Sequence, residues 1–336
     1  MANTAAIVGE ENSLSLMEEI EALIGADLRI SEQILTEELQ TTNAYVRDLL
    51  QHVSRFRGKR LRPMLVLLTA QACGGVTREH QVLAAVVEMI HLATLIHDDI
   101  LDDATLRRHV ATVNARWNNE SAVLFGDYLF THSFRLASTL PTAEACRLIG
   151  QATNQVCEGE MTQVKERGNL ELSEEAYFQI LAGKTGALCA VCGQLGALYA
   201  GATVETVSAM ERYGRQLGLA FQIADDVLDL VGAEKETGKT LHSDLQKQKL
   251  TLPLIRLLKT LPLEQATAVR QRLAQPDEQT YVQLQADFAT SDAFAYTRHT
   301  AERFAVAAQQ ELQILAPSRA RGLLRKIADF AVSRSY

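Results

Sequence analysis

The sequence predicts an all-α protein, a large helical bundle around a central cavity. Apolar residues recur at intervals of three and four along almost the whole chain, which is the period of amphipathic helices. No convincing run of alternating β-branched residues indicates a strand. The 336 residues are 47% hydrophobic and include only 6 prolines, so the chain can bury a large core.

Turn-forming residues divide the predicted helices. The expected breaks lie at Gly74-Gly75, near Pro141, at 167–173, at 231–243, at Leu261-Pro262, around Pro276 and at Pro317-Ser318. None is long or polar enough for a flexible interdomain linker, so we expect residues 1–336 to form one domain. The stretch after about residue 260 carries amphipathic helices without recognisable chemistry, which predicts a packing role.

Composition narrows the function classes. A net charge of −8 argues against a nucleic-acid-binding surface. The 5 scattered cysteines suit reduced thiols in the cytoplasm, and residues 1–12 show no secretory signal. Cys189-x-x-Cys192 lacks a second Cys/His pair, which favours core side chains over a zinc site. The apolar segment 185–204 contains Gln194, so we expect a buried central helix and no transmembrane segment.

An acidic motif occurs twice. Residues 91–102 (HLATLIHDDILD) and 218–229 (GLAFQIADDVLD) align without gaps, and each ends an apolar run with Asp-Asp-x-Leu-Asp. Residues four apart face the same side of a helix, which predicts paired carboxylates. The predicted pairs are Asp98 with Asp102, Asp99 with Asp103, and Asp225 with Asp229.

Such carboxylate pairs need a cation. In a half-desolvated cleft the repulsion within each pair would cost roughly 3 kcal/mol. Oxygen-only ligands favour a hard cation, and Mg²⁺ typically takes one or two carboxylates and completes its shell with water and phosphate. Two such helices facing one another therefore predict a metal-diphosphate clamp.

A basic segment is a candidate anion-binding site. Residues 55–63 (RFRGKRLRP) hold five basic side chains, and Pro63 suits the first turn of a helix, whose positive end attracts anions. A solvated basic turn explains the segment equally well. Arg107-Arg108 and His91 are candidates for a second anion pocket.

Three further polar side chains end apolar stretches. Lys184-Thr185 precede one, and Gln222 stands three residues before Asp225, near the face of the second motif. Buried polar groups need partners, which a substrate or a helix carbonyl could supply.

Two other patterns are weaker. Glu88-x-x-His91 is half of a di-iron pattern, but no second Glu-x-x-His exists, so His91 is either an anion ligand or a core histidine. Residues 232–240 (GAEKETGKT) separate their glycines by five residues, where a nucleotide P-loop requires four. Lys239 in this connection remains a candidate anion ligand.

Six motifs together resemble the trans-isoprenyl diphosphate synthases, most closely the bacterial long-chain polyprenyl enzymes of the octaprenyl or solanesyl type. In chain order they are GKRLRP at 58–63, HDDILDDATLRR at 97–108, GDYLF at 126–130, EGEMTQ at 158–163, KT at 184–185 and FQIADDVLD at 221–229. The resemblance covers about residues 45 to 260. Alternatives are a shorter-chain synthase of the geranylgeranyl or farnesyl class, a terpene cyclase, or a catalytically silent subunit of a heteromeric synthase.

The resemblance implies an isoprenoid-synthase-type helical bundle, usually a homodimer, that uses three Mg²⁺ ions to grip an allylic diphosphate. It implies metal ligation by Asp98, Asp102 and Asp225, with Asp99, Asp226 and Asp229 in supporting positions. It implies that isopentenyl diphosphate is held by Lys59, Arg62, His91 and Arg108, and the allylic diphosphate by Arg107, Lys184 and Lys239. Thr185 and Gln222 should face the reacting carbons and act in catalysis with Lys184. The product would pass to a membrane.

Three positions depart from the pattern of the family. Arg57 replaces a frequent Gly, His109 stands where Gly often follows the Arg pair, and Ser243 replaces one of two acids after the second motif. We expect the main clamp to survive these changes.

Product length should depend on the space beneath the first motif. Ala93 and Thr94 are small residues at positions where short-chain members of the family commonly place an aromatic plug. Phe130 and Phe134 are candidates for the floor of the cavity. We therefore expect room for a long product, and expect Ala93→Phe to shorten it.

Overall fold

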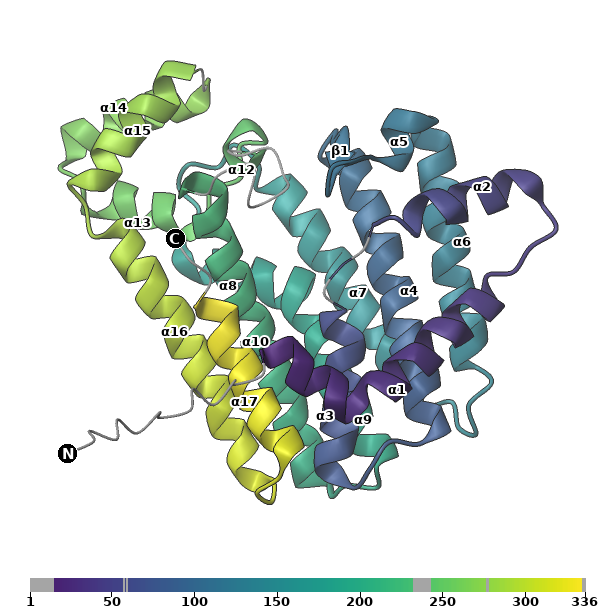
Figure 1. Cartoon of the computed structure of the whole chain (residues 1–336). Helices are drawn as coiled ribbons and strands as arrows, with labels where there is room; N and C mark the ends of the chain where they lie inside the picture. The colour runs from purple at the N-terminus through teal and green to yellow at the C-terminus, as the bar shows by residue number, and fades with distance from the viewer. Residues whose placement is uncertain (1–14, 57, 59, 232–242, 276–277, 334–336) are drawn as a thin grey trace, which may run out of the picture.

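The computed structural model describes residues 15–56, 58, 60–231, 243–275 and 278–333 (Figure 1). Within these ranges the regular secondary structure is helical apart from one short hairpin, which confirms the predicted all-α class. The helices up to residue 199 are α1 (Leu16–Glu38), α2 (Ala44–Val53), α3 (Leu61–Cys73), α4 (Arg78–Leu101), α5 (Val113–Arg116), α6 (Asn119–Ala137), α7 (Glu144–Lys165), α8 (Glu174–Leu181), the π-helix η1 (Ala182–Gly186) and α9 (Ala187–Tyr199). The later ones are α10 (Val204–Val231), α12 (Ser243–Gln246), α13 (Leu252–Thr260), α14 (Leu263–Ala274), α15 (Glu278–Ala289), α16 (Ala293–Glu311), the 3₁₀-helix η2 (Leu312–Ile314) and α17 (Arg319–Val332).

Two long helices organise the bundle. Helix α4 packs against α1, α3 and α6, whereas α10 packs against α9, α16 and α17. The contact between α3 and α9 joins these two groups. As a result the two acidic motifs, far apart in sequence, lie on helices of one bundle.

The core consists of two clusters that share α10. The first contains Leu65, Leu83 and Tyr213, and the phenolic O–H of Tyr213 donates to the carbonyl of Leu324 in α17 (2.8 Å). The second gathers side chains of α8, the C-terminal half of α10 and α13 to α16. The C-terminal helices therefore have the packing role that their sequence predicts.

Among the described residues, two helical stretches are long and apolar enough to span a membrane by length and composition, Arg78–Leu101 and Glu174–Tyr199. Their most apolar windows are 61% and 72% buried inside the fold. Their hydrophobicity is thus used in packing against other helices, as expected for the segment that begins at residue 185.

The predicted breaks at Gly74-Gly75, Pro141, 167–173, Leu261-Pro262 and Pro317-Ser318 all fall between helices. Those at 231–243 and Pro276 lie largely outside the described residues.

A short hairpin was not expected from the sequence. Strand β1 (Leu106–Arg107) pairs antiparallel with β2 (Val110–Ala111), and two residues per strand are too few to show an alternating pattern. The turn residues Arg108 and His109 have φ angles of 51° and 64°. Positive φ at both central positions is the geometry of the tight hairpin turn that glycine and asparagine favour.

His109 therefore occupies a left-handed position at a conformational cost. We expect His109→Gly to stabilise the protein by about 1 kcal/mol, because glycine adopts this conformation without strain. Gly201→Ala is the matched control: Gly201 has φ 72° and open space around its Cβ position, so the substitution should destabilise by a similar amount. Urea unfolding of both variants checks this, and a lower midpoint for His109→Gly would contradict it.

Candidate active site

One cavity of about 2440 Å³ unites the two acidic motifs. Asp98 reaches it from α4, Asp102 from the C-cap position of α4, and Asp225, Asp226 and Asp229 from α10. The prediction that both motifs share one site is confirmed.

Asp98 and Asp102 differ in their electrostatic surroundings. Burial raises the pKa of Asp98, with Glu160 and Asp102 adding to the rise and Lys184 opposing it. Burial would also raise the pKa of Asp102, but Lys249 and, more weakly, Lys184 lower it below its ordinary value. Asp102 is therefore the more firmly ionised member of the pair.

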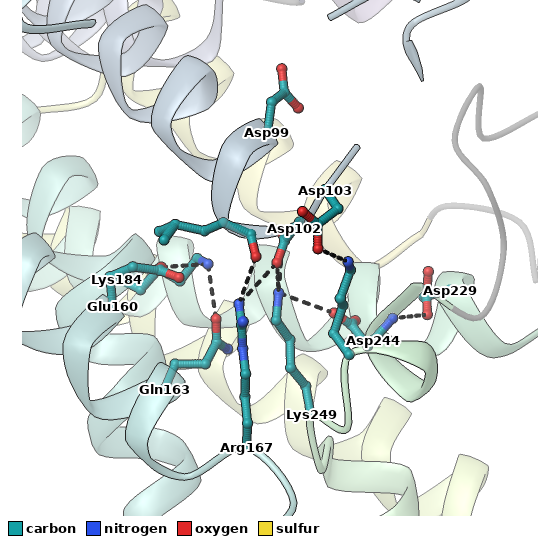
Figure 2. Close-up of polar contacts among 12 residues, drawn as sticks. Asp99, Asp102, Asp103, Glu160, Gln163, Arg167, Lys184, Asp229, Asp244 and Lys249 are labelled. Carbon is teal, nitrogen blue, oxygen red and sulfur yellow. Dashed lines mark hydrogen bonds and ion pairs between the residues drawn. The ribbon is translucent and has the colours of Figure 1, made fainter. Parts of the chain in front are cut away.

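The expected pairing of Asp99 with Asp103 is wrong. Helix α4 ends at Leu101, so Asp103 lies beyond it with φ 45°, and its carboxylate binds the Nζ atom of Lys247 (3.0 Å). Asp99 is buried and accepts from Nε (2.8 Å) and Nη2 (2.6 Å) of Arg107. Figure 2 shows Asp99 well apart from the cluster around Asp102. Asp99 thus orients Arg107, and the helix ends too early to carry a second pair.

Asp226 belongs to a buried polar chain. Its carboxylate accepts from the O–H of Tyr177 (2.6 Å) and from Nε2 of Gln222 (2.9 Å), while the Thr185 hydroxyl donates to Oε1 of Gln222 (3.1 Å). Burial is the main cause that raises the pKa of Asp226 to about 8. Thr185 and Gln222 therefore find side-chain partners within the site, where the sequence left a helix carbonyl as an equal alternative.

Asp225 and Asp229 also line the cavity, and Asp229 accepts from the backbone N–H of Asp244 (3.2 Å; Figure 2). Among the described residues, no three carboxylate, histidine or cysteine side chains are close enough to hold a metal ion by themselves. The carboxylates are divided between two walls and contribute only oxygen. Such a set fits a hard divalent cation that completes its shell with water and phosphate.

A π-helical turn carries Lys184 and Thr185. Helix α8 continues through η1 into α9, and π turns inside α-helices are frequent at functional sites. A Cβ atom on Gly159 would lie 2.6 Å from the backbone nitrogen of Lys184. Only glycine at this position lets α7 approach the π turn so closely.

The Lys184 ammonium faces acidic and polar groups of α7. Its Nζ atom lies 2.5 Å from Oε2 of Glu160 and 2.9 Å from Oε1 of Gln163 (Figure 2). Burial would lower the pKa of Lys184, but Asp98 and Glu160 raise it above its ordinary value. The site thus holds a charged ammonium beside the first acidic motif.

The basic candidates lie on the same cavity. Its lining includes Arg62, His91, Arg107 and Arg108. Burial, followed by Arg62 and Arg108, holds the pKa of His91 well below its ordinary value, so His91 is neutral at pH 7. This arrangement favours an anion-binding pocket over a solvated basic turn. Lys59 and Lys239 lie outside the described residues.

The turn after β1 connects this pocket to the chain before α3. Arg108 donates to the carbonyl of Phe56 (2.8 Å), and a Cβ on Gly58 would lie 2.6 Å from its guanidinium group. Glu88, the acid of the half di-iron pattern, instead pairs with Arg60 (2.5 Å).

Several site residues escaped the sequence analysis. They are Glu160, Gln163, Arg167, Tyr177, Asp244 and Lys249, all of which contact a predicted site residue or another member of this group. Glu160 and Gln163 stood within a recognised motif, which was a usable signal. Lys249 stood in an ordinary charged stretch, so only the tertiary fold reveals it.

The floor of the cavity is not where the sequence placed it. Thr94 lines the cavity, but Ala93 is fully buried elsewhere, because neighbouring helical positions point about 100° apart. Phe130 and Phe134 pack against one another on α6 and are not among the described residues of the lining. Apolar lining residues of α1, α2 and α4 include Leu28, Leu35, Leu50, Leu92 and Leu95.

Comparisons with known proteins agree with this geometry. The family model for polyprenyl synthetase matches residues 43–287. The chain is 34% identical over 323 residues to the all-trans-nonaprenyl-diphosphate synthase of Rhodobacter capsulatus, covering 96% of this chain and 99% of that one. It is 33% identical over 320 residues to the octaprenyl diphosphate synthase of Escherichia coli K12, covering 95% and 99%.

Solved structures show the same fold. A decaprenyl diphosphate synthase from Rhodobacter capsulatus superposes with a TM-score of 0.89 at 32% identity, covering 94% of this chain and 98% of that chain. A polyprenyl synthase from Caulobacter crescentus CB15, complexed with calcium and isoprenyl diphosphate, gives 0.90 at 33% identity, covering 95% and 98%. With the family model matched over most of its length, this chain belongs to the polyprenyl synthetase family of prenyltransferases.

Proposed function

We propose that the protein adds isopentenyl diphosphate to an allylic diphosphate in successive head-to-tail 1'-4 condensations, making long all-trans polyprenyl diphosphates with Mg²⁺ as the metal. The observation that carries this proposal is one cavity that combines opposed carboxylates, a cluster of cations and an apolar extension. The long-chain synthases among its relatives support the product class.

The carboxylates suit an allylic diphosphate. Asp98 on α4, Asp102 at its C-cap and Asp225 on α10 would hold up to three Mg²⁺ ions, which when bound neutralise the charge of the leaving diphosphate. Asp226 and Asp229 support this wall through their bonds to Gln222 and to the Asp244 backbone.

The cations complete the leaving-group site. Breaking the allylic C–O bond places negative charge on the diphosphate and positive charge on the carbon chain. Lys184, charged beside Asp98, and Arg107, oriented by Asp99, would bind the diphosphate together with Lys239. Thr185 and Gln222 hold each other in place, and their oxygen atoms would stabilise the allylic cation.

The second substrate would bind at the basic side. Lys59, Arg62 and Arg108 would hold the diphosphate of isopentenyl diphosphate, and neutral His91 would donate a hydrogen bond to it. Fixing the double bond beside the cation turns a bimolecular addition into an oriented step. The released diphosphate would accept the proton that the condensed product loses, because none of the side chains named above has the role of a base.

The chain would act as a single domain and as a homodimer in the cytoplasm, with no nucleic-acid partner, and pass its product to a membrane. Exposed apolar side chains on α6 and α7 support self-association: Val123, Leu124 and Met161 expose 43%, 69% and 64% of their area.

A product assay tests the proposed function. Purified protein with Mg²⁺, isopentenyl diphosphate and farnesyl diphosphate should yield a series of polyprenyl diphosphates of increasing mass, and a chelator should abolish it. A series that stops at geranylgeranyl length would favour the shorter-chain alternative. A complete lack of product, with or without metal, would favour a silent subunit.

The first motif should show a sharp division between neighbouring carboxylates. Asp102→Asn should lower kcat/KM by about 10²- to 10³-fold, because it removes charge from the metal-binding wall. Asp103→Asn should change kcat/KM by less than about threefold, as ordinary surface substitutions do. The Asp103 side chain is 83% exposed and bonds only to Lys247 in the described part of the site. Equal losses of kcat/KM in the two variants would contradict this assignment and support the pairing of Asp99 with Asp103.

Product length should respond at Thr94. Thr94→Phe narrows the cavity wall and should shorten the products, since each five-carbon unit gains roughly 4 kcal/mol from burial. Ala93→Phe should instead destabilise the fold by about 1–3 kcal/mol through overpacking, because Ala93 is fully buried and outside the lining. Mass spectrometry of products and thermal unfolding separate the two effects. If Ala93→Phe kept its stability and shortened the products while Thr94→Phe left product length unchanged, this assignment would be overturned.

A further inference from the structure

Tyr177 supports the second acidic motif from behind the cavity wall. Its side chain is buried on α8 and is not among the described residues that line the cavity, so its route to the site runs through other side chains. Its O–H donates to Oδ2 of Asp226 (2.6 Å), and a hydrogen bond with the backbone of Leu252 ties the same hydroxyl to the start of α13. Tyr177 thus holds Asp226 from a fixed position.

Asp226 passes this constraint on to Gln222. While Oδ2 of Asp226 accepts from Tyr177, its Oδ1 accepts from Nε2 of Gln222 (2.9 Å), one helical turn earlier on α10. Because Asp226 is the acceptor, the nitrogen end of the Gln222 amide faces it. The carbonyl end points the other way, where the Thr185 hydroxyl donates to Oε1 of Gln222 (3.1 Å).

The backbones that carry Thr185 and Gln222 already lie close together. Gly218 stands one turn before Gln222 on α10. A Cβ atom on Gly218 would lie 3.0 Å from the Cα of Gly186 and 3.2 Å from the carbonyl oxygen of Thr185. Helix α10 and the π turn therefore have little room to shift, and the rotation of the Gln222 amide is the main freedom left. This rotation decides whether the carbonyl oxygen or the NH₂ group faces a cation.

We propose that Tyr177 is a positioning residue for the condensation: through Asp226 it fixes the Gln222 amide with its carbonyl oxygen toward the carbon chain of the allylic substrate. The inference rests on the proposed function and adds to it a residue outside the cavity lining. Without the Tyr177 hydroxyl, Oδ2 of Asp226 loses a donor, and the amide of Gln222 can sample both orientations. A dipole that must reorient during the reaction stabilises the cation less than one that is already in place.

Tyr177→Phe tests this role, because it removes the hydroxyl and keeps the ring. Single-turnover reactions with enzyme in excess over farnesyl diphosphate measure the first addition of isopentenyl diphosphate separately from product release. The rate of this addition should fall by about 10- to 100-fold, as the loss of outer hydrogen-bond partners typically costs at metal-dependent sites. The concentrations of isopentenyl diphosphate and of Mg²⁺ that give half the maximal rate should stay as in the wild type.

Gln222→Met separates positioning from general damage to the fold. Met is close to Gln in shape but has no amide to orient. Adding Tyr177→Phe to Gln222→Met should therefore cause little further loss of rate, whereas independent damage to packing would multiply the two losses.

Tyr213→Phe is the matched control. Tyr213 is also a buried tyrosine whose O–H donates a hydrogen bond, to the carbonyl of Leu324 (2.8 Å), and it is not among the described residues of the cavity lining. This variant should lower the midpoint of thermal unfolding about as much as Tyr177→Phe does, but it should keep the wild-type rate of addition.

A wild-type rate in folded Tyr177→Phe, an equal loss in Tyr213→Phe, or fully multiplied losses in the double variant would overturn the inference. A loss of rate that excess Mg²⁺ restores would also overturn it, because the effect would then lie in metal binding. A wild type that yields no product removes the proposed function itself, whereas an active wild type with an unaltered Tyr177→Phe removes the positioning role alone.

Discussion

The arrangement of this protein depends on electrostatic repulsion between carboxylates crowded at the ends of two helices. The ends of α4 and α10 bring Asp98, Asp102, Asp225 and Asp229 to one cavity, where burial makes each unbalanced charge costly. The surrounding structure supplies the balance. Lys184 lies beside Asp98, and loops far apart in sequence deliver Arg167 and Lys249 to Asp102. Packing between α9 and α10 and between α3 and α9 holds the two walls of the cavity, and therefore these ion pairs, in position.

The sequence predicts the fold and the principal carboxylates because both depend on local periodicity. Helical spacing identifies the apolar faces, and the repeated motif identifies Asp98, Asp102 and Asp225 as one group. Periodicity cannot show where a helix ends, which is why Asp103 was assigned to a pair with Asp99. It also fails at Ala93 and Thr94, where a single step along the helix separates the core from the cavity.

The residues that escaped prediction are those defined only by tertiary contacts. Tyr177 reaches Asp226 from another helix, and Lys249 reaches Asp102 from a loop 147 residues further along the chain. Neither side chain has a sequence neighbour that reveals its partner. The hairpin of β1 and β2 was missed for a related reason, since its turn depends on left-handed conformations that Arg108 and His109 rarely adopt.

The π turn at Ala182–Gly186 has a further consequence for the helix that carries Lys184 and Thr185. A π turn holds one residue more than an α turn, so it shifts the angular register between the segments before and after it. Tyr177 can therefore face Asp226 while α9 keeps its apolar side against α3 and α10. The helical segment Glu174–Tyr199 thus carries a polar site at one end and packs into the core at the other.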